Sequence, residues 1–468
     1  MKAINTWSFQ QYKPFCWYAG DIYINRVVPD SNSIHIEWSP IDADEYSVYY
    51  KFRNHPEFKL AGTTKNTEFD IINLGRHYEY EFYVATGDKK SRVRLARTGE
   101  AIGTVVNYMH PEDKIYWHSG NNLCSPSIVR HPDGYLLCSM DIHGGNGAPQ
   151  NLTLIFRSDD NGASWHYVSE LMPCYWGKLF IHKGDLYMYA TSTEYGDLLI
   201  GKSTDGGKTF GMPIVIGRGS GGKQGREGFH KNVENMIEYK GRIYLSVEWG
   251  SWFNKELFHA AGIISCDANA DLMDPENWHI AEFLPYDPTW PGVANGHAGG
   301  TLEGSLAVGP DGNLYNIMRY SINPKAIPNK NLALAYKVNA NDPDAPLEYS
   351  HSIKFNGNDV KFVIQYDEIG KKYYSIVNYK PDDREVGRTI IALVSSPDME
   401  NWSLTKILYD FSNCDQSKVG VQYVDFLIEG NDIIYLCRTA LNNAENFHNS
   451  NYTTFHRIEN FRDLTPIE

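Results

Sequence analysis

The stretch HPDGYLLCS, residues 131–139, is a turn that contains a glycine and leads into an apolar strand. Five further stretches repeat this pattern, namely HKGDLYMYA around Gly184, YKGRIYLSV around Gly241, GPDGNLYNIM around Gly312, DEIGKKYYSIV around Gly370 and EGNDIIYLC around Gly430. The six glycines, beginning with Gly134, lie 50, 57, 71, 58 and 60 residues apart, which is the length of a four-stranded unit. Six such units predict a six-bladed β-propeller, in which each blade lends one or two side chains to an active site at the axis.

A second repeat lies within the first. The sequences SDDNGASW (158–165) and STDGGKTF (203–210) fit the pattern S-x-D-x-G-x-x-W, with Phe in place of Trp in the second, SPDMENW (396–402) is a shortened copy, and DPENW (274–278) is a remnant. In such a turn we expect Ser and Asp to bond nearby backbone N–H groups, Gly to take a positive φ and the aromatic residue to fill the blade. These turns resemble the Asp boxes of sialidase-like propellers, which are structural in that family.

Composition limits the class of protein and its partners. At 468 residues the chain is too long for one core, so we expect two domains. No apolar run approaches the ~18 residues that a membrane span needs, and a net charge of −14 argues against nucleic acids and anionic membrane surfaces as partners. The aromatic content of 13% suits β-structure and the stacking of sugar rings, so we expect a carbohydrate substrate. The oligomeric state is not indicated.

The N-terminal sequence MKAINTWSFQQYK lacks the apolar core of a signal peptide, which favours a cytoplasmic location. The alternative is a secreted protein whose leader is absent from this chain. The seven cysteines are scattered and odd in number, which indicates reduced, buried thiols. Neither CxxC nor HExxH occurs, so no metal or other cofactor is predicted.

The domains are expected to be a segment over 1–23, a small β-sandwich over 24–100 and the propeller over 105–468. Short alternating strands such as IHIEWSP and HYEYEFYVAT predict the sandwich. This part resembles a fibronectin type III module. The resemblance implies that Trp38 is the core tryptophan and that Tyr80, six residues after Leu74, forms the tyrosine corner.

Charged residues that interrupt the apolar strands mark the axis. Glu303 precedes the first strand of the fourth unit and Arg319 ends the second, so the intervening turn should bring the two together. Arg388 opens a strand in the fifth unit, and Tyr423 lies at the start of the sixth. Charges in apolar strands are costly unless they are paired or used.

This ordered set resembles the active site of the sialidase superfamily. The resemblance implies that Tyr423 is the nucleophile, that Glu303 is its base, and that Arg319 and Arg388 hold a substrate carboxylate. Two features depart from the family. The first blade should open with Arg-Ile-Pro but reads CSPSI (124–128), so one clamp arginine is missing. The acid loop reads MDIHGGNG (140–147), where Asp141 and His143 are the titratable residues and neither can be assigned as the acid.

Each of the other cleft candidates could have a functional role, or it could instead make a structural hydrogen bond or pack in the core. His230 could act as a base. Candidates for substrate binding are Arg438, Gln422, Glu248, His297, Trp176 and Trp249, with Trp252 and Trp290 as further stacking surfaces.

The sequence therefore favours an exo-acting, sialidase-like glycoside hydrolase that removes a terminal sugar. The altered clamp and acid suggest an acidic sugar other than ordinary sialic acid, or a neutral one. A polysaccharide lyase is the first alternative, in which arginines neutralise a uronate and Tyr423 or His230 removes the C5 proton. A non-catalytic glycan-binding propeller is the second.

Overall fold

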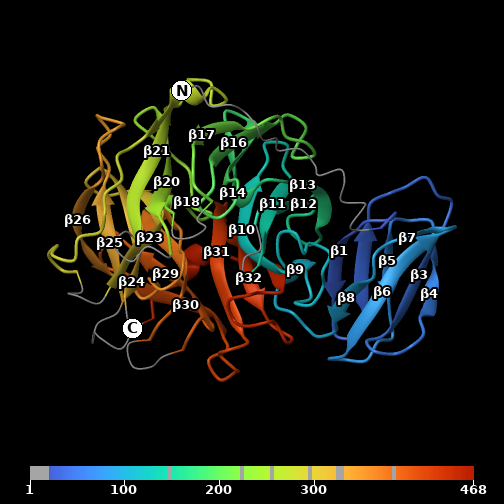
Figure 1. Cartoon of the computed structure of the whole chain (residues 1–468). Helices are drawn as coiled ribbons and strands as arrows, with labels where there is room; N and C mark the ends of the chain where they lie inside the picture. The colour runs from blue at the N-terminus through green and yellow to red at the C-terminus, as the bar shows by residue number, and fades with distance from the viewer. Residues whose placement is uncertain are drawn as a thin grey trace.

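The protein is all-β, as the sequence predicts (Figure 1). The computed structural model describes residues 20–144, 150–221, 226–252, 258–293, 298–322, 331–381 and 386–467. Within these ranges the helical elements are two 3-10 turns, η2 (Pro275–Asn277) and η3 (Phe461–Asp463). None of the described helices has the length and apolar character required to traverse a membrane.

Two antiparallel sheets form the N-terminal β-sandwich, one with the order β1-β2-β5 and the other with the order β4-β3-β6-β7, in which β8 also pairs with β6. The strands are β1 (Ile24–Pro29), β2 (Ile34–Trp38), β3 (Tyr46–Phe52), β4 (Lys59–Thr64), β5 (Glu68–Ile71), β6 (Glu79–Thr86), β7 (Lys89–Lys90) and β8 (Arg94–Arg97). Trp38 packs edge-on against Tyr46 in the shared core. The hydroxyl of buried Tyr80 accepts a hydrogen bond from the Gly75 N–H at 2.7 Å, which ties this strand to the preceding turn.

Six further sheets of four or five strands follow, which confirms the six-bladed propeller. The first two blades are β10 (Asn122–Arg130), β11 (Leu136–His143), β12 (Thr153–Ser158), β13 (His166–Leu171), and β14 (Tyr175–His182), β15 (Asp185–Thr191), β16 (Leu198–Ser203), β17 (Ile214–Gly217). In the third blade the inner strand is divided, so that both β18 (Gly228–His230) and β19 (Ile237–Tyr239) pair with β20 (Arg242–Gly250), followed by β21 (His259–Asp267) and β22 (Trp278–Ile280).

The fourth and fifth blades are β23 (Ala298–Val308), β24 (Leu314–Ile322), β25 (Leu332–Lys337), β26 (Glu348–Lys354), and β27 (Ile364–Asp367), β28 (Lys372–Asn378), β29 (Ile390–Ser396), β30 (Ser403–Asp410). The sixth consists of β31 (Gly420–Glu429), β32 (Asp432–Ala440), β33 (Tyr452–Ile458) and, at its outer edge, β9 (Thr104–Tyr108). Because β9 precedes the first blade in the chain, its pairing with β33 closes the ring and covers an open sheet edge.

The predicted glycine turns join the first and second strands of all six blades. Five of the glycines have positive φ, as a tight turn requires, for example Gly134 at 94° and Gly312 at 75°. The fifth turn differs, because Lys371 rather than Gly370 takes the left-handed conformation, with a φ of 52°.

The first strands surround the axis. A cavity of about 820 Å³ at their turn ends is lined by residues from all six blades, which include Ile128, Leu179, Ile237, Leu306, Ile364 and Phe426. Deeper along the axis, side chains of one blade accept backbone N–H groups of the next. Ser127 Oγ accepts from Leu179 N at 3.2 Å, and Asp425 Oδ2 accepts from Ile128 N at 2.9 Å and pairs with Lys178 Nζ at 2.6 Å. These bonds fix the relative height of neighbouring blades.

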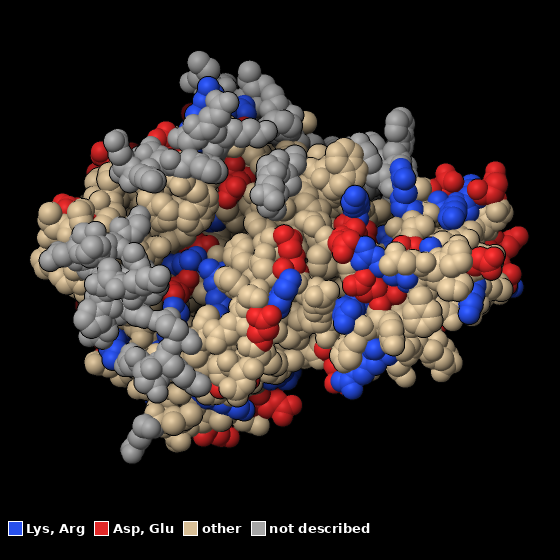
Figure 2. Space-filling model, turned by 60° about the horizontal axis from the view of Figure 1, so that its bottom comes forward, with Lys and Arg blue, Asp and Glu red and all other residues tan. Residues whose placement is uncertain are grey.

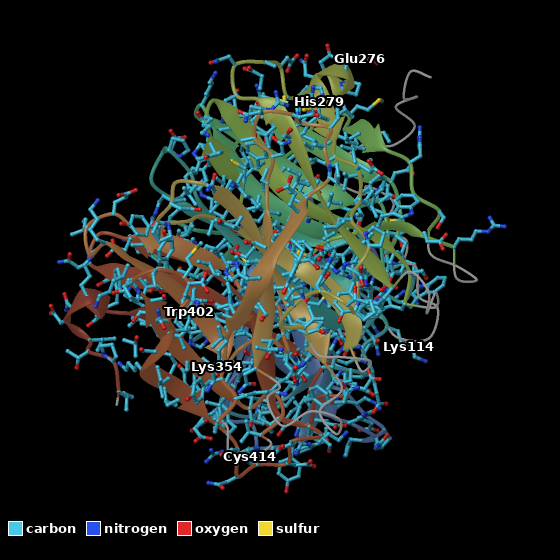
Figure 3. The ribbon with its side chains drawn as sticks, turned by 90° about the vertical axis from the view of Figure 1, so that its left-hand side faces the viewer. Lys114, Glu276, His279, Lys354, Trp402 and Cys414 are labelled. Carbon is cyan, nitrogen blue, oxygen red and sulfur yellow. The ribbon has the colours of Figure 1, made fainter. Side chains whose placement is uncertain are left out.

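The serine–aspartate turns lie on the outside of the propeller. Asp160 Oδ1 accepts hydrogen bonds from Ser158 Oγ and Ser164 N, both at 2.8 Å, and Trp165 is fully buried. Asp205 makes the matching bonds in the second copy. In the shortened copy the Trp402 indole donates to Met399 O, and in the remnant Asp274 caps η2. Figure 3 labels Trp402 of the shortened copy, Glu276 within the remnant and His279 immediately after it.

The sandwich packs against the first and last blades, beside β9 and β13 (Figure 1). Arg94 Nε donates to Asp113 at 2.6 Å, and Tyr23 Oη donates to Glu170 on β13 at 2.8 Å. Burial raises the pKa of Glu170 to about 8, so this carboxyl is protonated at neutral pH.

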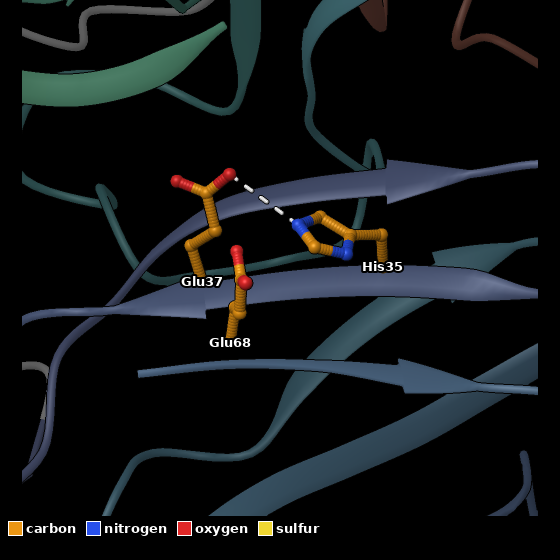
Figure 4. A group of neighbouring side chains, drawn as sticks. All are labelled: His35, Glu37 and Glu68. Atoms are coloured by element: carbon orange, nitrogen blue, oxygen red, sulfur yellow. Dashed lines mark hydrogen bonds and ion pairs between the residues drawn. The ribbon is translucent and has the colours of Figure 1, made fainter. Parts of the chain in front are cut away.

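His35, Glu37 and Glu68 also meet at this seam (Figure 4). Their ligand atoms are close enough to hold a metal ion. However, Glu37 Oε1 already accepts from Arg26 Nη1 at 2.5 Å, and the two His35 ring nitrogens face Glu37 and Asp70. These side chains therefore form an ion-pair network that links the β1-β2-β5 sheet to β9, since Arg26 on β1 also donates to Val106 O.

Candidate active site

Four inner strands carry the same β-bulge near their starts. The register shifts after Cys124, Tyr175, Leu302 and Gln422, and in each case the next residue is left-handed: Ser125, Trp176, Glu303 and Tyr423, with φ between 46° and 55°. This conformation is uncommon for residues other than glycine and costs roughly 1–3 kcal/mol. A bulge redirects one side chain out of the pleat. Repeated at equal positions around one axis, it places these four side chains at the end of the propeller opposite the glycine turns.

A second set of polar residues lies at the ends of the second strands, seven or eight residues after each turn glycine: Asp141, Thr191, Glu248, Arg319, Asn378 and Arg438. Several of them bond to the bulge of the next blade. Asp141 Oδ1 accepts from Gly177 N and Glu248 Oε1 accepts from Gly304 N, both at 3.4 Å. Asn378 Nδ2 donates to Val421 O at 2.6 Å. These side chains hold the strained bulges in place.

Glu303, Tyr423 and Arg319 form a compact cluster. Tyr423 Oη donates to Glu303 Oε1 at 3.2 Å, and Arg319 Nη1 lies 2.5 Å from Glu303 Oε2 and 3.3 Å from Tyr423 Oη. Asn232 Nδ2 also donates to Glu303 Oε1 at 2.6 Å. Burial opposes the charge on Glu303, but Arg319 and His230 outweigh it and hold the pKa of Glu303 below its usual value. An ionised carboxylate therefore faces the tyrosine hydroxyl.

Three arginines surround the Tyr423 side chain. The guanidinium carbons of Arg388 and Arg438 lie 5.6 and 5.1 Å from its ring centroid, and Arg319 reaches its hydroxyl. Within the part of the chain that the structure describes, the buried Nε atoms of Arg319 and Arg438 have no hydrogen-bond partner. Gln422 accepts from Arg388 Nη1 at 2.5 Å, so it positions this arginine. The arrangement can bind an anion beside the phenol. Charged side chains of both signs are also visible in a hollow of the propeller face (Figure 2).

The two acid candidates from the sequence do not suit proton donation. Asp141 is fully buried and bonded to Thr153 Oγ1 at 2.5 Å, and although burial raises its pKa to about 7, it supports the Trp176 bulge from behind. His143 Nδ1 bonds Tyr175 Oη at 2.9 Å, and burial and the charge of Arg438 lower its pKa to about 3. His143 is therefore neutral at pH 7.

His230 and Glu248 form a buried pair, with 2.6 Å between Nδ1 and Oε2. The imidazole is enclosed by the rings of Trp176, Tyr195, Trp252 and His259, with centroids 4.3 to 5.9 Å away. The imidazole interacts electrostatically with both Glu303 and Glu194. His230 therefore belongs to the wall between these two carboxyls.

Of the remaining sequence candidates, only some lie at the axis in the described part of the chain. Trp176 stands at the axis, but Trp249 points to the opposite face of β20 from Glu248 and packs against Phe229 in a core cluster. Trp290 stacks on Tyr349 at 4.5 Å in the core of the fourth blade. His297 lies outside the described residues.

Sequence reasoning missed several members of this group, which are Glu194, Gln150, Tyr175, Asn232 and His259. Asn232 follows His230 where the inner strand of the third blade is divided, and this departure from the strand pattern was a detectable signal. Tyr175 and His259 begin β14 and β21, whereas Glu194 and Gln150 come from connections between strands, where no repeat marks them.

No protein-family model matches this chain, and no curated protein matches it in sequence. Solved structures do resemble it. An alpha-L-arabinanase of Penicillium chrysogenum has 13% identity and a TM-score of 0.53, with 78% of this chain and 99% of that chain covered. The GH93 alpha-L-arabinofuranosidase of Fusarium graminearum has 14% identity and a TM-score of 0.50, with 76% and 98% covered.

A protein of unknown function from Dyadobacter fermentans has 13% identity and a TM-score of 0.51, with 76% of this chain and 98% of that chain covered. Identities this low establish a shared fold and leave the activity open. The propeller is similar to these proteins in fold, and the comparisons establish nothing beyond the fold.

Proposed function

We propose that the protein is a glycoside hydrolase that removes a terminal acidic sugar from a glycan. The observation that carries this proposal is the contact between Tyr423 Oη and ionised Glu303, with Arg319 bound to both. The similarity of the fold to an arabinanase and an arabinofuranosidase adds support, because both are carbohydrate-active.

In the proposed reaction Glu303 takes the proton of Tyr423, and the phenolate attacks the anomeric carbon. A phenol starts neutral, so it approaches an anionic substrate without the repulsion that a carboxylate nucleophile would meet. Arg319 stabilises the charge that passes between the two side chains. Water then releases the sugar from the tyrosyl intermediate, so the first product should keep the anomeric configuration of the substrate.

The three arginines support an acidic substrate. Arg319, Arg388 and Arg438 converge on one phenol, and Arg438 comes from the sixth blade rather than the first. The corresponding first-blade bulge carries Ser125, whose small side chain leaves space beside the cationic group. A clamp built from this side would orient a carboxylate differently from one completed by a first-blade arginine.

A place in the sialidase superfamily is part of this proposal, as is the fibronectin type III nature of the sandwich. The serine–aspartate turns and the Tyr–Glu–Arg cluster support the first. The hydrogen bond between Gly75 N and Tyr80 Oη, of the kind found in a tyrosine corner, supports the second.

The test is a panel of 4-methylumbelliferyl glycosides of sialic, uronic and neutral sugars, together with uronate-containing oligosaccharides. We expect release of an acidic monosaccharide with retained configuration by NMR, and loss of turnover in Tyr423→Phe, which removes only the nucleophilic oxygen. Inverted product, or full activity of Tyr423→Phe, contradicts the mechanism. Binding of the glycans without turnover would favour a non-catalytic role.

The His230–Glu248 pair favours one second candidate, a polysaccharide lyase. A carboxylate that orients a histidine is a suitable arrangement for abstracting the C5 proton of a uronate, while the arginines neutralise its carboxylate. An unsaturated uronate product absorbs in the ultraviolet, whereas a hydrolysis product does not, so one spectrum distinguishes the two reactions.

A further inference from the structure

Glu194 lies on a tight loop between β15 and β16 and is bonded through both carboxyl oxygens. Gln150 Nε2 donates to Oε2 at 3.0 Å and Trp252 Nε1 donates to Oε1 at 3.2 Å. The next residue, Tyr195, is left-handed with a φ of 58° and is fixed by bonds to Trp252 N and His259 Nε2. The loop therefore holds this carboxyl in one orientation.

A chain of contacts links Glu194 to the proposed nucleophile. Gln150 accepts from Tyr175 Oη at 3.2 Å, and this hydroxyl bonds His143 at 2.9 Å. The ring of His143 lies against that of His448, which contacts Arg438 beside Tyr423. Glu194 also interacts electrostatically with His230, as Glu303 does. Glu194 is thus linked from the second blade to the cluster around Tyr423, through these contacts and through His230.

The other carboxyls of the described cleft are less suited to donate a proton. Asp141, Glu234 and Glu248 are buried, the first and last support bulges, and Glu234 accepts a hydrogen bond from Asn232 N. Asp359, which acts on Arg319, is paired with Lys380. Glu194 has no basic partner at ion-pair distance among the described residues and remains partly exposed.

Trp252 adds a second property to this position. The residue is 43% exposed although its indole N–H donates to Glu194. An exposed aromatic ring beside a carboxyl is suited to stacking on a pyranose ring. Trp252 therefore offers a stacking surface immediately beside the acid.

We propose that Glu194 is the general acid of the reaction and that Glu194 and Trp252 form the subsite for the leaving sugar. This inference rests on the proposed function. The carboxyl proton of Glu194 passes to the glycosidic oxygen as the bond to the anomeric carbon breaks and the bond to Tyr423 Oη forms. The carboxylate then takes a proton from the water that attacks the same carbon, and Tyr423 regains its proton from Glu303.

Burial raises the pKa of Glu194 above its usual value, more than His230, Trp252 and Gln150 lower it. The titratable groups that face it are His230, Tyr175 and Tyr195. A protonated acid at neutral pH is what the first step needs.

The experiment compares the 2,4-dinitrophenyl and the methyl glycoside of the sugar that the panel identifies. We expect Glu194→Gln to lower kcat/KM for the methyl glycoside by about a hundredfold or more, and for the dinitrophenyl glycoside by less than about threefold, since a good leaving group needs no proton. The alkaline limb of the pH profile should also disappear. Asp359→Asn, the matched control, should leave the ratio between the two substrates unchanged.

Equal loss on both substrates, or no loss on either, overturns the role of Glu194 while the activity of the wild type still supports the proposed function. A wild type that hydrolyses neither glycoside overturns the proposed function itself. Trp252→Phe provides a second measurement if Glu194→Gln does not fold. It removes a donor to the carboxylate, so the alkaline limb should move to higher pH, and an unmoved limb counts against the proposal.

Discussion

Glu303 at the axis and Asp160 on the outer turns show two ways in which this propeller uses a carboxylate. Glu303 stands on a left-handed bulge, is buried, and bonds side chains from two other blades. Asp160 is exposed and bonds only its own turn, through Ser158 and Ser164. The pKa of both lies below the usual value, but the cause differs. Local hydrogen bonds suffice for Asp160, whereas Glu303 depends on a cation that overcomes burial.

Glu170 on β13 completes this comparison. It is as buried as Glu303 but has hydroxyl neighbours, Tyr23 and Tyr167, instead of an arginine. Burial then dominates and raises the pKa to about 8. The same side chain is thus a charged base at the axis and a neutral group under the sandwich, and the difference lies in the partners that the tertiary structure supplies.

The largest effect is expected at the axis. Glu303→Gln removes the charge but keeps the shape, so kcat should fall by about a thousandfold. Activity assays measure kcat, and circular dichroism checks separately that the variant is folded. If the variant retains more than about a tenth of kcat, a loss below ~1.4 kcal/mol, Glu303 is not the base. Its role would then be structural, like that of Asp160.

The arginines should act as one unit. Arg319→Lys and Arg388→Lys are each expected to lower kcat/KM by about a hundredfold, because a point charge does not replace the planar guanidinium fork. The double variant should lose much less than the product of the two. Additive losses would mean that the arginines bind separate groups.

An uncharged control makes the clamp test specific. The wild type should strongly prefer the acid over the analogue reduced to an alcohol, and the arginine variants should show little preference. A wild type that treats both alike has a neutral substrate.

Under the sandwich, the sign of the pH dependence is reversed relative to the axis. Because the folded pKa of Glu170 is about 8 and the unfolded value is near 4.5, the folded state binds the extra proton between these values and loses stability as pH rises. Glu170→Gln should therefore raise stability at pH 8 by about 4 kcal/mol and leave it little changed at pH 4. Equal denaturation midpoints at pH 8 for the two proteins would contradict this account.

The outer turns should show the smallest effect. Asp160→Ala and Asp205→Ala each remove bonds to an exposed turn, and we expect a loss of ~1 kcal/mol in the free energy of unfolding with kcat unchanged. Thermal melts and assays under identical conditions check both. A large fall in kcat at a constant Tm would give these turns a role at the axis and remove the contrast with Glu303.

The sequence by itself determined the fold class, because glycine turns and serine–aspartate turns are local and recur at blade length. It also determined the pairing of Glu303 with Arg319, because both residues belong to one hairpin and its register follows from the turn. Local geometry was enough for these predictions.

The tertiary structure alone decided which side chains share the cleft. Asp141 in an altered acid loop appeared as available as Glu303, but contacts with Gly177 and Thr153 place it behind a bulge. Glu194 reaches the cleft from a loop whose sequence carries no distinguishing repeat, whereas Arg438 occupies on β32 the strand-end position that Arg319 occupies on β24. Their protonation and orientation depend on neighbours distant in sequence, such as Trp252 and His448. No local pattern encodes those contacts, because they arise only when six separate blades meet at one axis.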